Sequence, residues 1–339
     1  MTRSMPSALL IALILLTAAG CEDLSRRDAG ADPALLGAAP PDTAALFAPG
    51  LVNRGLPCRD VALAPDGNEI WWCEQVGEFR HSVLTTARRV DGVWREPAVA
   101  SFSGDPRWHD IEPAFSPDGG TLFFASDRPA TGDGPAAETT SIWRVRRTDH
   151  GWGVPERLPD AVNDGNTFFP SPTVDGTLYV TRDLEGGVSA VYRCRLVDGE
   201  YSPAELLPPQ VNAGRTRFNA MVDPRERFLI VPVFGLPDSR GGVDYYLVAR
   251  NPDDTWEEPV NLGDAVNSEA RREWSAALSP NGGTLWFMSD RALPAPADAP
   301  RLTRERLRAL QASPGNGQSG IWWIDAKAVA PLRPYLAER

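Results

Sequence analysis

The feature that most constrains the fold is a turn motif that recurs along the chain, at intervals of roughly 50 to 57 residues. The copies read "VALAPDGNEIWW" (61–72), "AFSPDGGTLFF" (114–124), "PTVDGTLYV" (172–180), "MVDPRERFLIV" (221–231) and "ALSPNGGTLWF" (277–287). In most copies a Pro-Asp-Gly-type turn joins two apolar runs, which predicts a β-hairpin whose turn residues are structural. The 221–231 copy keeps this pattern without the glycine. A repeat of this length is typical of the four-stranded blades of a β-propeller.

Further segments recur at the same interval as these hairpins. A third apolar segment follows each one, at 82–90, 141–147, 190–196, 244–250 and 320–326. A polar turn then leads to a fourth segment, opened by Trp94, Trp152, Tyr201 or Trp256, and most fourth segments close on Val-Asn. Large aromatic side chains at one repeat position are expected to pack between neighbouring blades.

The two ends of the repeat array are complementary. The fifth unit stops at its third segment, 320–326, whereas "ALFAPGL" (45–51) with Val52-Asn53 resembles a fourth segment without a blade. A circular array must hide its strand edges, so we expect the N-terminal strand to complete the last blade. The predicted fold is therefore all-β, a single propeller closed by an N-terminal strand, with five blades; six blades is the alternative.

The core "SPDG…L.F.S.R…IW", which covers nearly the whole mature chain, resembles the TolB-type WD40-like repeat, also called PD40. This resemblance implies an exported bacterial propeller, and propellers of this type commonly contact other envelope proteins. The expected function is a protein- or ligand-binding or scaffolding module rather than an enzyme. The expected partner is an envelope protein or a small ligand.

The N-terminus indicates export. Arg3 precedes a short apolar run, 9–16, and "LTAAGC" (16–21) resembles a bacterial lipobox, which implies lipid attachment at Cys21. A plain signal peptide is the alternative. The predicted organisation is a lipoprotein signal peptide (1–20), a flexible tether after the lipidated cysteine (21–42) and the propeller (43–339). The predicted location is the cell envelope, on the periplasmic or extracellular side, with the lipid as membrane anchor.

The charge and the cysteines add two further expectations. The formal net charge is −11 and Lys327 is the only lysine, so the chain is a poor candidate for binding nucleic acid. An exported protein meets an oxidising compartment, so a Cys58–Cys73 disulfide is possible, leaving Cys194 free.

The loops assign a candidate site to one face of the propeller. We define the upper face as the one where the first strand of each blade begins; the lower face carries the Pro-Asp-Gly turns. Upper loops include the long segments 129–140 and 292–319, and residues 301–312 have helical spacing. Long loops on a rigid scaffold often carry function, so the upper face is the expected site.

Aligned turns place a set of polar side chains near the upper mouth as a candidate ligand or metal site: Asp60, His109, Asp110, Glu112, Asn219 and Glu273. No cofactor is expected, and Ca²⁺ at the channel mouth is the alternative. The ends of the second strands supply blade-linking or rim residues: Asp127, Arg128, Arg182, Asp183, Asp290 and Arg291.

An alternative function is a propeller hydrolase, either a glycoside hydrolase or a lactonase-like enzyme. Asp60, Glu112, Asn219 and Glu273 would then act at the channel mouth. This analogy rests on architecture alone, because the motifs of those families are absent from the sequence.

Overall fold

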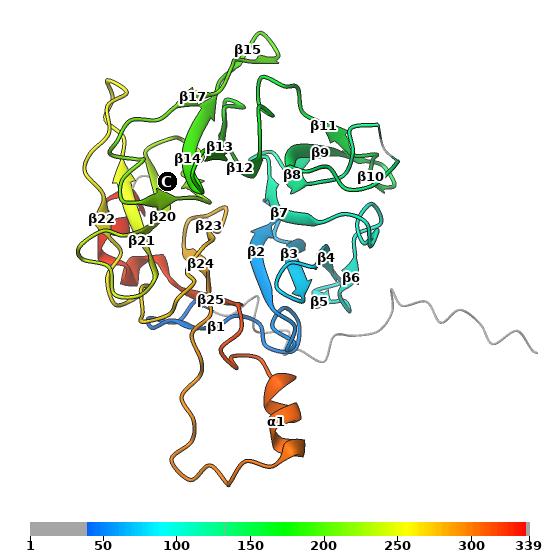
Figure 1. Cartoon of the computed structure of the whole chain (residues 1–339), viewed down its shortest axis with the longest axis vertical. Helices are drawn as coiled ribbons and strands as arrows, with labels where there is room; N and C mark the ends of the chain where they lie inside the picture. Colours follow the sequence, from blue (N-terminus) through cyan, green and yellow to red (C-terminus); the bar gives the residue numbers. More distant parts are fainter. Residues whose placement is uncertain (1–38, 132, 337–339) are drawn as a thin grey trace, which may run out of the picture.

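The computed structural model describes residues 39–131 and 133–336. The segment predicted to be a signal peptide, Cys21 and most of the predicted tether lie outside these residues. Within them, five blade sheets are arranged around a central axis, and a small two-stranded sheet lies beside the third blade (Figure 1). The all-β, five-bladed propeller predicted from the repeats is confirmed.

Each blade follows one sequence repeat. The first contains β2 (Cys58–Leu63), β3 (Glu69–Val76), β4 (His81–Val90), β5 (Val93–Trp94) and β6 (Ala98–Val99). The second contains β7 (Asp110–Phe115), β8 (Thr121–Ser126), β9 (Ser141–Thr148), β10 (Gly151–Trp152) and β11 (Glu156–Arg157). The third contains β12 (Thr167–Pro172), β13 (Leu178–Leu184), β14 (Val188–Cys194) and β17 (Glu205–Leu206), with a small hairpin of β15 (Leu196–Val197) and β16 (Glu200–Tyr201) beside it.

The last two blades are built in the same order. The fourth contains β18 (Thr216–Arg217), β19 (Met221–Val222), β20 (Phe228–Phe234), β21 (Val243–Ala249) and β22 (Val260–Asn261). The fifth contains β23 (Ala276–Leu278), β24 (Thr284–Ser289), β25 (Gly320–Asp325) and, from the other end of the chain, β1 (Ala45–Leu46).

The N-terminal strand closes the ring as expected. β1 runs antiparallel to β25, with Leu46 opposite Trp322 (Figure 1). The next residue, Phe47, is fully buried and makes edge contacts with Trp286 and Trp323. Because this strand fills the outer edge of the fifth blade, the first and last repeats are held together.

The core is divided into five clusters, each between two neighbouring blades. Between the first and second blades, Trp71 of β3 packs against Phe102 and, edge on, against Trp152. Trp94 and Trp256 are buried in other clusters. The prediction that these aromatic residues pack between blades is confirmed.

The Val-Asn ending has a role that the sequence did not predict. The Asn163 amide accepts from the backbone nitrogen of Ile142 at 2.6 Å and donates to the oxygens of Ile142 and Leu158. The same bonds to the third strand of a blade are made by the corresponding asparagines: Asn53, Asn212 and Asn267. Each side chain therefore satisfies backbone groups where the fourth strand stops pairing.

The possible Cys58–Cys73 disulfide is not formed. Both residues are buried free thiols, as is Cys194. The thiol of Cys58 lies against Asn53, whereas that of Cys73 lies against the backbone of Asp110 in the second blade. The two residues pair with Glu74 and Arg59 and not with each other, and their thiols meet different blades, so no bridge can form without moving backbone.

The insert between β24 and β25 extends away from the blades and contains α1 (Arg304–Gln311), which confirms the predicted helix (Figure 1). The side chain of Thr303 caps its N-terminus, and none of its residues is buried. After β25 the chain continues through η3 (Ala326–Ala328), η4 (Ala330–Leu332) and α2 (Arg333–Leu336). None of the described helices is long and apolar enough to cross a membrane.

Candidate functional site: a polar ring and a cavity on the propeller axis

Equivalent residues in the first strands of the blades have an unusual backbone. Asp60, Glu112, Phe169 and Asn219 have φ angles of 60°, 61°, 50° and 49°. In the first three blades this residue lies where the pairing of the first two strands shifts register. Residues with side chains rarely adopt left-handed φ, and each such residue costs of order 1–3 kcal/mol. The same local strain is therefore kept in four blades.

The side chains at these positions form a closed hydrogen-bonded circuit, which we call the axial ring: Arg59, Asp60, Glu112, Asn219 and Ser275, with the backbone nitrogen of Phe169. Arg59 Nε donates to Asp60 Oδ2 at 2.6 Å, and another guanidinium nitrogen donates to Glu112 Oε1. Glu112 Oε2 accepts from the Phe169 nitrogen at 2.7 Å, and Oε1 accepts from Asn219 Nδ2 at 3.3 Å.

The circuit closes through the fifth blade. Asn219 Nδ2 also donates to Ser275 Oγ at 3.2 Å, and the Ser275 hydroxyl donates to Asp60 Oδ1. All five side chains are buried. The ring therefore joins the five blades at the axis through polar contacts.

Burial also sets the protonation of the ring. It raises the pKa of Glu112 from its ordinary 4.5 to about 7, and the guanidinium of Arg59 only partly offsets this. Burial opposes the charge of Arg59, but the neighbouring carboxylates of Asp60 and Glu112 raise its pKa overall. Arg59 thus remains charged, and Glu112 titrates near neutral pH.

An aromatic cluster, formed by Phe79, Phe218 and Trp274, lies over the ring on the upper face. Phe79 stacks on Trp274 with 6.0 Å between ring centroids, and Phe218 meets Trp274 edge on. The Arg59 guanidinium lies 5.5 Å from the centroid of Phe79 and 5.9 Å from that of Trp274. These cation–π contacts hold the guanidinium between the aromatic cluster and the carboxylates. A smaller hollow of about 420 Å³ lies beside this cluster, between the first and fifth blades.

A larger cavity of about 620 Å³ lies on the other side of the axial ring. Asp60, Glu112 and Ser275 form its polar floor. Its wall is mainly apolar and includes residues from all five blades: Leu63, Ala114, Phe115, Pro170, Met221 and Leu278. Its rim is formed by the turns between first and second strands: Pro65, Pro117, Val174, Pro224 and Pro280. The cavity therefore opens on the lower face, opposite to the face expected from loop length.

The six candidate ligand or metal residues do not form one site. Asp60, Glu112 and Asn219 meet in the axial ring, but Asp110 binds Arg128 at 2.5 Å and Ser103 at 2.8 Å. His109 lies 2.5 Å from Asp127 and also contacts the backbone oxygen of Arg80.

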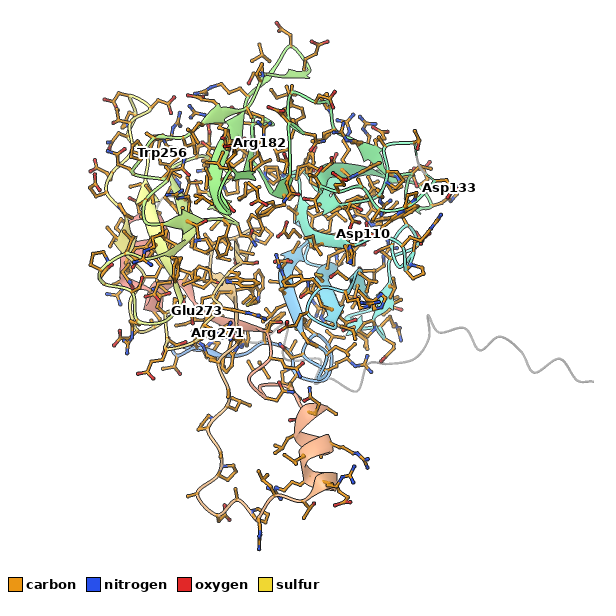
Figure 2. All side chains as sticks on the ribbon, viewed as in Figure 1. Asp110, Asp133, Arg182, Trp256, Arg271 and Glu273 are labelled. Atoms are coloured by element: carbon orange, nitrogen blue, oxygen red, sulfur yellow. The ribbon has the colours of Figure 1, made fainter. Side chains whose placement is uncertain are left out.

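Glu273 is held separately, by Arg291 and Ser268 at 2.7 Å each, and Figure 2 shows Asp110 and Glu273 in different blades. Over residues 39–131 and 133–336, no group of three or more His, Cys, Asp or Glu is placed to hold a metal.

Three rim arginines bind the linker that enters their own blade. Arg128 donates to the backbone oxygen of Phe102, Arg182 to that of Val162 at 2.7 Å, and Arg291 to that of Val266. The Arg182 side chain, labelled in Figure 2, is 8% exposed. Each contact ties a blade to the segment arriving from the preceding blade.

The neighbouring rim aspartates bind the loop before the first strand of the same blade. Asp127 accepts from the backbone nitrogen of His109 at 2.7 Å, Asp183 from the side chain of Asn166 at 2.6 Å, and Asp290 from the backbone nitrogens of Arg271 and Arg272. The Asp-Arg doublets therefore bind separate partners rather than each other.

No family model matches this sequence, and a comparison with characterised proteins finds no relative. Solved structures give distant matches. TolB from Acinetobacter baumannii is 14% identical with a TM-score of 0.45, over 80% of this chain and 54% of that one. A putative TolB from Agrobacterium tumefaciens is also 14% identical, with a TM-score of 0.43, over 80% of this chain and 90% of that one. A gluconolactonase from Xanthomonas campestris is 12% identical with a TM-score of 0.39, over 88% of this chain and 96% of that one.

This chain thus spans about half of the Acinetobacter protein. The fold itself is established by the order of strands within the blades and by the pairing of β1 with β25. Together with the turn motif carried by successive blades, this topology makes the chain a five-bladed β-propeller.

Proposed function

We propose that this protein is a binding module of the bacterial cell envelope, held at a membrane by lipid on Cys21, and that its ligand or partner segment enters the lower-face cavity. The observation that carries this proposal is the cavity of about 620 Å³, whose apolar wall is built by all five blades and whose rim is open. Cavities of this size with apolar walls and a few polar groups are typical ligand sites.

The arrangement of carboxylates favours binding over hydrolysis. Asp60 and Glu112 share one guanidinium, that of Arg59, and both are buried within the axial ring. Glu273, the fourth residue considered for a hydrolase, is bonded instead to Arg291, Ser268 and Ser289 and does not join the axial ring. The paired carboxylates therefore serve to join blades.

A photo-crosslinking experiment tests the cavity. A photoreactive residue at Val174, which is 67% exposed on the rim, should capture a partner in living cells. Ala114→Trp would fill the cavity from its wall and should abolish the adduct. Ala98→Trp, on the exposed outer strand β6, should leave the adduct unchanged. An adduct that persists in Ala114→Trp at full strength would refute binding in the cavity.

Lipid attachment is tested separately. Metabolic labelling with a fatty acid should mark the wild-type protein and not Cys21→Ser, and the variant should leave the membrane fraction. A labelled Cys21→Ser protein, or one equally retained on membranes, would contradict the anchor.

A further inference from the structure

The insert between β24 and β25, residues 292–319, which we call the arm, differs in charge from the rest of the chain. It has four arginines and two acidic residues: Arg301, Arg304, Arg306, Arg308, Asp298 and Glu305. The formal net charge of the arm is therefore +2, whereas the whole chain has −11 and the remainder −13. Across residues 39–131 and 133–336, none of these four guanidinium groups has an ion-pair partner. The arm thus presents unpaired positive charge on an acidic protein.

The helix of the arm, α1, separates apolar and charged side chains. Leu307 and Leu310 are three residues apart and share one face of the helix. Arg304 and Arg306 lie on the two flanks of this face, and Glu305 lies on the opposite side. Both leucines are exposed to solvent, by 52% and 44%. An apolar face bordered by arginines is typical of short helices that lie in the interface of a membrane.

The propeller covers a different face of this helix. A hollow of about 470 Å³ separates the end of α1 from the first blade, and Arg308, Gln311 and Ala312 line it on the side of the arm. Leu307 and Leu310 lie outside this hollow. Their face is therefore open to a partner from outside the propeller.

The arm and the route to the proposed lipid anchor belong to the same blade. β1 is the outer strand of the fifth blade, and the arm joins β24 to β25 in that blade. Figure 1 shows β1 and α1 on the same side of the ring. Cys21 precedes the first residue of β1 by 24 residues, and a chain of this length spans at most about 80 Å. Lipid on Cys21 would keep the arm within reach of the bilayer.

We propose that α1 lies on the surface of an anionic lipid bilayer, with Leu307 and Leu310 in the headgroup region and Arg304 and Arg306 against lipid phosphates. This inference rests on the proposed lipid anchor at Cys21. Because the anchor holds the arm at a high local concentration, a contact too weak to bind a membrane alone is sufficient. An anionic surface attracts the arginines of the arm and repels the acidic propeller, so the contact also sets the orientation of the propeller.

Fluorescence quenching in vesicles tests this inference on the full-length lipidated protein. A dye is attached to Leu310→Cys, since Cys21 is blocked by lipid and the free thiols of Cys58, Cys73 and Cys194 are buried. Lipids that carry a nitroxide in the headgroup region should quench this dye in phosphatidylglycerol vesicles. Quenching should be at least about twofold weaker in phosphatidylcholine vesicles or at high salt, because the attraction is electrostatic.

Matched variants assign the quenching to the arm. Arg304→Gln combined with Arg306→Gln should weaken it at least about twofold in phosphatidylglycerol vesicles. Arg89→Gln combined with Arg146→Gln removes the same charge from exposed positions of β4 and β9, and should leave it unchanged. A dye at Val197→Cys, on the hairpin beside the third blade and opposite α1 in Figure 1, should stay unquenched.

The outcomes separate the arm from the anchor. Equal quenching in both kinds of vesicle, or an unquenched dye on protein that floats with the vesicles, would overturn the inference and leave the anchor standing. The same conclusion would follow if the dye stayed unquenched while a photoreactive residue at Leu307 captured an envelope protein in cells. Protein that carries no lipid and does not float with the vesicles would overturn both.

Discussion

The buried carboxyl of Glu112 gives a pH dependence of stability whose sign and size follow from the structure. Its pKa is about 7 in the folded protein, against an ordinary value of 4.5 that we take for the unfolded chain. The folded state therefore binds this proton more tightly. The resulting stabilisation is complete below pH 4.5, declines as the pH rises from about 4.5 to about 7, and is lost above that.

The size of the effect follows from the two pKa values. One pKa unit corresponds to about 1.4 kcal/mol, so the change amounts to about 3 kcal/mol of unfolding free energy. Other groups also titrate in this range, so the informative quantity is the difference between the wild type and Glu112→Gln, which cannot titrate at this position. The charged and titratable groups that face Glu112, namely Arg59, Asp60 and Cys73, are present in both proteins.

Urea unfolding at pH 4.5, 6, 7 and 8 measures this difference. The glutamine loses a bond in the axial ring, which lowers stability by a constant amount at each pH. Superimposed on that offset, the variant should gain about 3 kcal/mol relative to the wild type between pH 4.5 and 8. Glu156→Gln, at a surface ion pair with Arg146, is the matched control and should follow the wild type. If the free energy of unfolding changed with pH in the same way for the wild type and Glu112→Gln, the assignment of a raised pKa to this carboxyl would be refuted.

Three further predictions concern the fold. Phe47→Ala should lower the free energy of unfolding by about 3–5 kcal/mol in chemical denaturation, because it empties a fully buried site in the strand that closes the ring; a loss below about 1 kcal/mol would argue against that closure. Asn163→Ala should cost about 3 kcal/mol through three buried hydrogen bonds, whereas Asn68→Ala, at an exposed turn, should cost little. Replacing residues 298–309 by a short Gly-Ser linker should change stability by less than about 1 kcal/mol, since α1 buries no residue, and a large drop in melting temperature would contradict this.

The number of blades and their closure could be predicted from the sequence because they depend on local patterns. Each blade has its own turn motif, and a circular sheet array must pair its two ends. The absent disulfide marks the limit of this reasoning. Sequence spacing placed Cys58 and Cys73 on adjacent strands, but the side to which each thiol points depends on a register shift between Arg59 and Ala62. A single extra residue in one strand reverses which side chains face each other.

The cavity opens on the face opposite to the one expected from loop length. Loop length favoured the upper face, where the aromatic cluster of Phe79, Phe218 and Trp274 covers the axis. The lower cavity, in contrast, is rimmed by repeat residues, the prolines of the turns, which looked purely structural.

One signal in the sequence does lead to the axial ring. At the equivalent position near the start of each first strand, the five repeats carry Asp60, Glu112, Phe169, Asn219 and Ser275. A position that is buried at the axis and yet differs in every blade is not needed for blade packing, which would select the same residue each time. Four of these side chains, those of Asp60, Glu112, Asn219 and Ser275, complement one another as donors and acceptors around the circuit. Phe169 contributes its backbone nitrogen instead. The variation at this position therefore marks a polar network rather than blade packing. We therefore expect exchanging Asn219 and Ser275 to disrupt the ring although both residues are retained, because the longer amide and the hydroxyl would each face the wrong partner.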